Sequence, residues 1–229
     1  MNKIQNKISA VILSGELSGD RYGGLLAVAL RNLDHGITLT GLGGDRMQNA
    51  GVVLFDHIKN YSAMGFAEVA RKLFQFRSLK NRVVAAIRSD PPDALILIDF
   101  PDFNLRVARE IHHWKKMNGA VRPKIFYYIP PQVWIWRKHR IHQIKTYCDA
   151  VFPIFAFEHE LFLKNNVASF YAGHPVRDFF TQDQYEQKTV QNQEHTVRVA
   201  LLPGSRPQEV KNILPVMLAA LAQFRHMSS

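Results

Sequence analysis

Residues 201–210 combine an apolar run, a tight turn and the start of a helix, a pattern that can bind an anion. Ser205 is a favourable N-cap residue, and Gln208 stands three residues after it, as a capping box requires. Unpaired backbone N–H groups and the helix dipole attract negative charge at such a helix start. Arg206 adds a fixed positive charge beside them. The sequence therefore predicts a phosphate-binding site here, with Gly204 in its turn.

A second candidate is Asp99, which directly follows the apolar run 94–98. A carboxylate at the end of a central strand is partly desolvated, which raises its pKa and makes it a better base. Asp102 comes three residues later and is better placed to cap a following helix. The alternative is that both acids serve only as capping residues.

The turn after the first apolar run holds two glycines, Gly15 and Gly19, that would let a ligand approach the backbone. Ser18 and Asp20 can cap the helix that follows, and Glu16 lies in the same turn. The segment is neither a Walker A loop nor a GxGxxG fingerprint. We interpret it as part of a binding site, with an ordinary β–α turn as the alternative.

Two later turns also follow predicted strands. One contains two prolines and then Trp134, Trp136 and Arg137, which could line a pocket or stack on a ring. A pair of tryptophans that only packs in the core is the alternative. The other turn places His174 between a glycine and a proline, where it could contact phosphate, act as an acid or base, or only shape the turn.

The predicted helix after Gly65 has an apolar face made of Phe66, Val69, Leu73 and Phe76. Cationic side chains surround that face: Arg71, Lys72, Arg77, Lys80 and Arg82. An apolar face rimmed by cations suits the surface of an anionic membrane. A helix that packs this face on the core and keeps a solvated basic side is the alternative.

Composition limits the function classes that fit. The chain has 229 residues, 47% of them hydrophobic and 21% charged, which excludes a disordered chain. A single cysteine, Cys148, excludes a disulfide framework and a cysteine-based zinc site. No apolar stretch approaches the roughly 20 residues that span a bilayer. The net charge of +10 indicates an acidic partner: nucleic acid, anionic lipid or a phosphorylated substrate.

Short apolar runs alternate with amphipathic segments along the chain, which predicts an α/β fold with a Rossmann-like parallel sheet and helices on both faces. We expect a first domain over 1–180, a polar linker over 181–196 and the start of a second domain over 197–229. The predicted strands cover 8–13, 38–42, 94–98, 124–128, 150–153, 169–171 and 197–202. The predicted helices cover 21–33, 65–87, 105–116, 138–147, 158–165 and 209–224.

Six motifs in this order resemble the lipid-A-disaccharide synthase family over nearly the whole chain. They are GELSGD at 15–20, NYSAMGFAEV at 60–69, IDFPDFN at 98–104, PQVWIWR at 131–137, GHP at 173–175 and LPGSR at 202–206. The resemblance implies the N-terminal half of a two-Rossmann (GT-B) glycosyltransferase plus the start of its second half. It also implies a cleft between the halves that holds the active site.

The resemblance implies an inverting transfer between UDP-2,3-diacylglucosamine and 2,3-diacylglucosamine 1-phosphate. The products would be a β-1,6-linked disaccharide 1-phosphate and UDP, with no metal or other cofactor. Asp99 aligns with an essential aspartate, the candidate general base. Arg206, with Gly204 and Ser205, aligns with an essential arginine that could hold the leaving diphosphate. The turn at 15–20 would face the same cleft.

The resemblance also places the protein in the cytoplasm, peripheral on the inner face of a Gram-negative inner membrane. The basic and apolar helix from Phe66 would dock on that anionic surface, where both acylated substrates reside. This explains the net charge better than nucleic acid does, and we expect no nucleic-acid partner because no helix-turn-helix, zinc-finger or RNP signature is present.

The departure from the family lies in the second half, of which only a strand, a turn and a helix are present. A complete half needs about 100 more residues. We expect a fragment or truncated product that is active only when the rest is supplied. An uncovered apolar face would favour association into a homo-oligomer. The alternative is a non-catalytic chain that keeps only acceptor or membrane binding.

Overall fold

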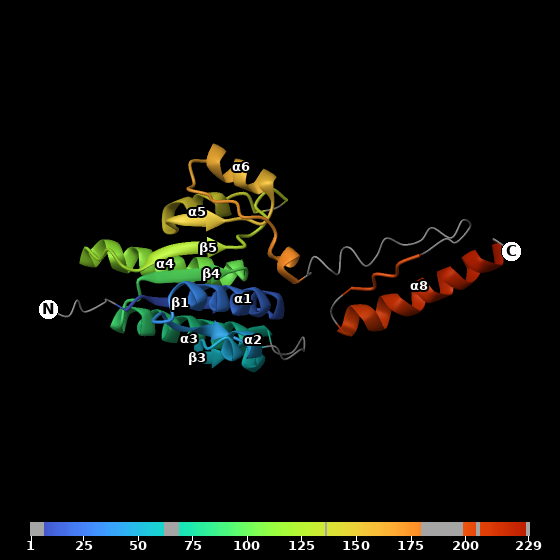
Figure 1. The fold of residues 1–229 in the computed structure, drawn as a ribbon, viewed down its shortest axis with the longest axis horizontal. Helices are drawn as coiled ribbons and strands as arrows, with labels where there is room; N and C mark the ends of the chain where they lie inside the picture. The colour runs from blue at the N-terminus through green and yellow to red at the C-terminus, as the bar shows by residue number, and fades with distance from the viewer. Residues whose placement is uncertain (1–6, 62–68, 136, 180–198, 205–206, 228–229) are drawn as a thin grey trace. The chain divides into compact units, whose positions relative to one another are not determined.

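The computed structural model describes residues 7–61, 69–135, 137–179, 199–204 and 207–227 (Figure 1). The chain divides into two compact units, Met1–Phe179 and Phe180–Ser229. Each unit is described by itself.

The first unit is built on a six-stranded, fully parallel sheet with the order β3-β2-β1-β4-β5-β6. The strands are β1 Ser9–Ser14, β2 Thr38–Gly43, β3 Val53–His57, β4 Ala94–Ile98, β5 Lys124–Tyr128 and β6 Ala150–Phe152. The predicted strand over 169–171 is wrong, because that segment makes only one bridge, between Val151 and Ser169. Strand β3 was not predicted, although residues 52–55 form a short apolar run; it lies at the edge of the sheet, and its residues stay at least partly exposed.

Helices cover both faces of this sheet, which confirms the expected α/β fold (Figure 1). They are α1 Leu17–Leu33, α2 Asp45–Asn49, α3 Val69–Ser89, α4 Pro101–Asn118, α5 Arg140–Tyr147 and α6 Ala156–Lys164, with short 3-10 turns η1 Ile58–Tyr61 and η3 Pro175–Phe179. Alternate strand residues point to opposite faces. Ile12 and Ile98 pack in the core that includes α1 and α2, whereas Leu13 and Leu97 pack in the core of α3 to α6.

Asn104 of α4 joins the carboxyl ends of the two central strands. Its buried Nδ2 donates to the carbonyl oxygens of Leu13 (3.4 Å), Ile98 (3.2 Å) and Asp99 (2.7 Å). The hydroxyl of Tyr127, from β5, donates to the same Asp99 carbonyl at 2.9 Å. Asparagine is a weak helix former, so its place on the buried face of α4 reflects these contacts.

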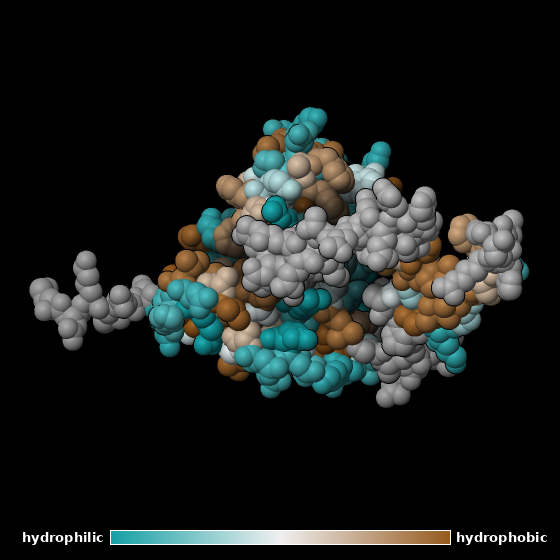
Figure 2. Space-filling model, turned by 45° about the vertical axis from the view of Figure 1, so that its right-hand side comes forward, coloured by the Kyte–Doolittle hydropathy of each residue, from teal (hydrophilic) through white to brown (hydrophobic). Residues whose placement is uncertain are grey.

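The second unit contains helix α8, Pro207–Met227. The strand predicted over 197–202 is wrong for its described part, since residues 199–202 adopt no strand. A strand is stabilised by pairing with a neighbour, and no described segment pairs with this one. Several apolar side chains of α8 are exposed, and Figure 2 shows hydrophobic surface on this part of the chain. They are Ile213, Val216, Leu218 and Phe224.

We predict that Asn104→Ala lowers the free energy of unfolding by about 2–3 kcal/mol, because it removes the Nδ2 donor from three buried carbonyl oxygens. Urea unfolding followed by circular dichroism measures the change. Asn118→Ala is the matched control, since Asn118 is an exposed residue at the end of the same helix. The control should lose less than about 0.5 kcal/mol. Equal losses for the two variants would contradict the assigned role of Asn104.

Candidate active site at the carboxyl ends of the strands

Three of the predicted turns meet where the strand order reverses, between β1 and β4. Ser14 of β1 lies beside Ile98 of β4, and Ile98 lies beside Tyr128 of β5. The chain therefore brings the turns that begin at residues 15, 99 and 129 to one edge of the sheet. Ligands of open parallel sheets bind at this kind of position.

Asp99 stands on a strained turn at the centre of this edge. Asp99 (φ 46°) and Phe100 (φ 49°) both adopt the left-handed conformation, which residues with side chains rarely occupy. The hydrogen bonds that Asn104 and Tyr127 donate to the Asp99 carbonyl hold this turn. Burial raises the pKa of the half-buried Asp99 carboxyl group, although the nearby Phe100 N–H opposes the shift. The geometry presents a carboxylate that accepts a proton readily.

Neither acid in this segment caps α4, so the capping alternative and the capping prediction for Asp102 are both wrong. The N-cap of α4 is Phe100, with no side-chain hydrogen bond to the helix. The Asp102 carboxylate instead accepts from Arg137 Nη1 at 2.8 Å and from Arg140 Nη2 at 2.5 Å. Arg140 is almost fully buried, so these contacts tie α4 to α5.

The glycines of the first turn make room for other parts of this chain. A Cβ on Gly15 would lie 2.2 Å from Cδ1 of Phe100, and one on Gly19 would lie 2.5 Å from Oγ of Ser14. Both glycines therefore permit packing between neighbouring loops. Of the other predicted residues in this turn, Glu16 and Ser18 are exposed at the edge of the sheet.

Asp20 does not cap its own helix. The N-cap of α1 is Glu16, which makes no side-chain hydrogen bond to the helix. The buried Asp20 carboxylate accepts from the backbone N–H groups of Gly44 (2.6 Å), Arg46 (3.0 Å) and Met47 (3.1 Å). Asp20 therefore caps α2, whose N–H donors lie 24 to 27 residues further along the chain. Both carboxylate oxygens of Asp20 accept hydrogen bonds from the protein's own backbone.

The tryptophan turn is described except for Trp136, which lies outside the described residues. Trp134 Nε1 donates to Glu158 Oε1 at 3.0 Å, and its ring meets Phe157 edge to face at 5.1 Å. Trp134 is 43% exposed, so the core-packing alternative does not fit this residue. Arg137 adopts a left-handed conformation (φ 53°) and directs its guanidinium to Asp102.

His174 shapes its turn and keeps one ring nitrogen for another partner. Its Nδ1 accepts from the Val176 N–H at 3.1 Å, and its ring lies 5.7 Å from that of Phe155. Because Nδ1 accepts, the neutral ring carries its proton on Nε2. No described residue binds Nε2, so this N–H can donate to a ligand.

The predicted phosphate site is described only in part, since Ser205 and Arg206 lie outside the described residues. Gly204 adopts a left-handed conformation (φ 105°), and a Cβ there would lie 2.5 Å from Oε2 of Glu209. Only glycine meets both demands. Helix α8 begins shortly afterwards, at Pro207.

The helix predicted over 65–87 is confirmed by α3, but Phe76 does not lie on an exposed apolar face of it. Phe76 is half-buried, and its ring lies 5.7 Å from Tyr61, 5.7 Å from Phe100 and 6.5 Å from Phe103. It turns toward α4 because an aromatic cluster receives it there, whereas Phe74 is 76% exposed. Phe66 and the side chains of Val69 and Leu73 lie outside the described residues.

Sequence reasoning missed a cavity of about 750 Å³ between α3 and α4. Aromatic side chains line it together with Arg106 and Arg109 of α4. The spacing of three residues, which puts both arginines on one side of a helix, was the available signal. Its aromatic lining begins at Phe100, directly after Asp99.

The described residues contain neither a candidate transmembrane helix nor a candidate metal site. No described helix is both long and apolar enough to cross a bilayer. No group of three or more histidine, cysteine, aspartate or glutamate side chains is arranged to hold a metal ion within the described ranges.

Comparison with known proteins finds a match over residues 10–229 to the family model described as lipid-A-disaccharide synthetase. The chain is 35% identical over 215 residues to the lipid-A-disaccharide synthase of Coxiella burnetii (strain Dugway 5J108-111), covering 93% of this chain and 55% of the relative. It is 38% identical over 218 residues to that of Syntrophus aciditrophicus (strain SB), covering 94% and 55%. The chain thus spans about half the length of these curated relatives.

Solved structures share the fold. The UDP-GlcNAc 2-epimerase from Neisseria meningitidis, bound to UDP-GlcNAc, matches with a TM-score of 0.51 at 7% identity, covering 75% of this chain and 47% of that one. The UDP-N-acetylglucosamine 2-epimerase from Rickettsia bellii matches with a TM-score of 0.50 at 11% identity, covering 82% and 50%. At these identities the likeness concerns the fold alone.

We predict that Asp99→Asn raises the free energy of unfolding at pH 7.5. The folded-state pKa of Asp99 is raised, so the ionised carboxylate is less stable in the folded chain than in the unfolded chain. The gain should shrink as the pH falls through the raised pKa toward the ordinary aspartate value of about 3.9, because both states then bind the proton. Urea unfolding at several pH values measures the difference.

Asp45→Asn is the control of opposite sign. Its hydrogen bond and ion pair with Lys59 lower the pKa of Asp45, so this variant should lose stability at neutral pH. A loss of stability in Asp99→Asn at neutral pH, or a gain that does not change with pH, would show that the Asp99 carboxyl group is not desolvated.

Proposed function

Since the chain belongs to the lipid-A-disaccharide synthetase family, we propose that it carries the acceptor half of an inverting glycosyltransferase of lipid A synthesis. The donor is UDP-2,3-diacylglucosamine and the acceptor is 2,3-diacylglucosamine 1-phosphate. Residues 1–180 form the acceptor and membrane domain, 181–196 the linker, and 197–229 the first part of the nucleotide-sugar domain. The named relatives and the parallel-sheet fold support this assignment.

The observation that carries the proposal is the Asp99 carboxylate on its left-handed turn. In the proposed step an acceptor hydroxyl oxygen bonds to the anomeric carbon of the donor. The bond from that carbon to the diphosphate oxygen breaks, and UDP leaves. Asp99 takes the hydroxyl proton as the new bond forms, and its raised pKa strengthens it as a base. Attack on the face opposite the leaving group gives the β-1,6 linkage.

The leaving diphosphate is assigned to Arg206, with the backbone of Gly204 and Ser205. The left-handed Gly204 and the start of α8 at Pro207, which flank these residues in the chain, support this assignment. A fixed guanidinium would stabilise the charge that develops on the leaving oxygen. This assignment requires no metal ion or other cofactor.

Substrate contacts within the first unit are assigned to groups that the structure leaves accessible. Glu16 and Ser18 are exposed at the sheet edge, and His174 has an Nε2 donor. Trp136 and Arg137 complete the proposed set. Gly15, Gly19 and Asp20 shape this edge through packing and hydrogen bonds.

We place the protein in the cytoplasm, on the inner face of the inner membrane. The net charge of +10 supports contact with an anionic lipid surface. Residues Phe66, Val69 and Leu73 remain the proposed membrane contacts. The exposed apolar side chains of α8 support association into a homo-oligomer.

A second candidate is a chain that binds acceptor or membrane without turnover. This chain covers 55% of the length of both curated relatives, and the proposed nucleotide-sugar domain is present only in part.

We predict that the 229-residue chain, mixed with a second chain that supplies the rest of the nucleotide-sugar domain, releases UDP and forms disaccharide 1-phosphate from both substrates in detergent micelles. Asp99→Asn should lower the rate by at least about 100-fold, because it removes the base with little change in shape. Asp45→Asn, an exposed acid on α2, should keep the wild-type rate.

An unchanged rate in Asp99→Asn would exclude this residue as the base. No UDP release by the wild type, with acceptor binding retained, would contradict turnover by this chain and favour the second candidate.

A further inference from the structure

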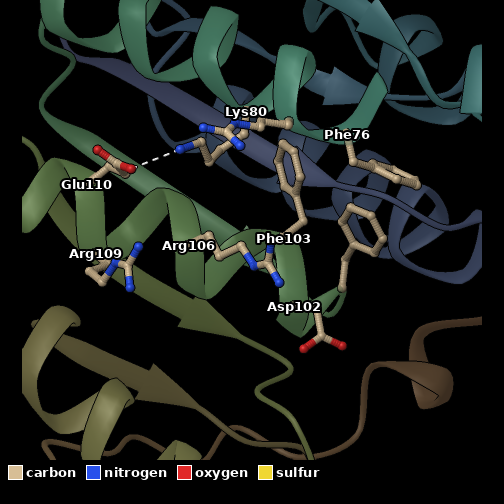
Figure 3. A pocket seen from close by; sticks show the side chains of 9 residues that line it. Phe76, Lys80, Asp102, Phe103, Arg106, Arg109 and Glu110 are labelled. Carbon is tan, nitrogen blue, oxygen red and sulfur yellow. Dashed lines mark hydrogen bonds and ion pairs between the residues drawn. The ribbon is translucent and has the colours of Figure 1, made fainter. Parts of the chain in front are cut away.

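The groove between α3 and α4 has an apolar floor of suitable size for a ligand. Phe76 comes from α3 and Phe103 from α4, and their rings meet edge to face with centroids 6.5 Å apart (Figure 3). Phe100 stacks on Phe103 at 5.3 Å and extends this floor toward the turn that holds Asp99. The cavity volume of about 750 Å³ lies within the range of small-molecule sites.

Cationic side chains line the same groove. Lys80 and Arg77 lie on the α3 side, and the Lys80 ammonium pairs with Glu110 at 2.8 Å (Figure 3). On the α4 side, Arg106 and Arg109 form no hydrogen bond or ion pair within the described part of the chain. Their guanidinium groups remain available to an anionic ligand.

Arg106 and Arg109 also line a second, neighbouring hollow of about 190 Å³. Arg137 and Arg140 line this hollow as well, and both donate to Asp102. The smaller hollow is therefore lined by four arginines and one carboxylate, that of Asp102, and the side chains of Asp102, Arg106 and Arg109 line both spaces. Such an excess of guanidinium groups suits a phosphate, which arginine binds through paired hydrogen bonds.

We propose that the groove binds the acylated sugar phosphate acceptor, with an acyl chain on Phe76, Phe100 and Phe103 and the phosphate on Arg106 and Arg109. This inference rests on the proposed function for the identity of the ligand. An apolar floor beside cations matches a molecule that joins an acyl chain to a phosphate. Phe100, which lines the groove, directly follows Asp99 in the chain.

Binding of three probes to the full chain tests each part of the groove. The probes are 2,3-diacylglucosamine 1-phosphate, the same diacyl sugar without phosphate, and glucosamine 1-phosphate without acyl chains. The double variant Arg106→Gln/Arg109→Gln should bind the first probe at least about tenfold more weakly, since two charge-assisted contacts are lost. Its binding of the diacyl sugar without phosphate should stay within about twofold of wild type, since that probe makes neither contact.

The floor is tested with Phe76→Ala, which should weaken both acylated probes by about tenfold or more. Phe74→Ala is the matched control, because it removes a ring from the exposed side of the same helix. Lys145→Gln/Lys164→Gln is the charge-matched control, because both lysines are exposed and lie on other helices. Both controls should bind as wild type does, and circular dichroism should show that every variant is folded.

The outcomes separate this inference from the proposed function. Unchanged binding of the phosphorylated probe in the double arginine variant would overturn the groove assignment, even if UDP release depends on Asp99. The assignment would also be overturned if the double arginine variant bound phosphatidylglycerol vesicles and the acceptor with equally weakened affinity. The two arginines would then contact anionic lipid in general rather than the acceptor phosphate. Selective weakening of the acceptor would support the groove even in a chain that releases no UDP.

Discussion

The hydrogen bonds of the Asn104 amide fix the carboxyl ends of the central strands, and the candidate site depends on them. One buried Nδ2 contacts the carbonyl oxygens of Leu13, Ile98 and Asp99. These contacts offset the cost of two consecutive left-handed residues, which an isolated chain would rarely adopt. The turn then directs Phe100 onto Gly15, where only a glycine leaves room for its ring.

Two regions at this edge of the sheet have different chemistry: a buried carboxylate that accepts a proton and exposed arginines that can bind an anion. Burial desolvates the Asp99 carboxyl group, so its pKa rises and it accepts a proton more readily. Along α4 the arginines face outward over the aromatic floor of the groove, where charge remains solvated. Asp102 joins these regions by holding Arg137 and the buried Arg140. Asp102 therefore holds the guanidinium groups of Arg137 and Arg140 near the proposed phosphate position.

The sequence predicted the sheet and the place of the site better than the contacts of single residues. Strands β4 and β5 have the predicted bounds because continuous apolar runs dictate them, and the turns that follow necessarily meet at one edge. The partners of Asp20 and Asp102 were missed because local capping rules describe only the nearest helix, whereas their donors lie 24 or more residues away. Phe76 was misplaced because helical periodicity defines a face and not what packs on it.

The central claim is that a backbone turn holds Asp99 as a desolvated carboxylate, ready to accept a proton. The most direct test is to follow the ¹³C signal of the Asp99 side-chain carboxyl group by NMR while the pH of the folded chain is varied. The account predicts a titration midpoint above the ordinary aspartate pKa of about 3.9, with Asp45 titrating below it in the same experiment. A midpoint for Asp99 at or below that ordinary value would contradict the account.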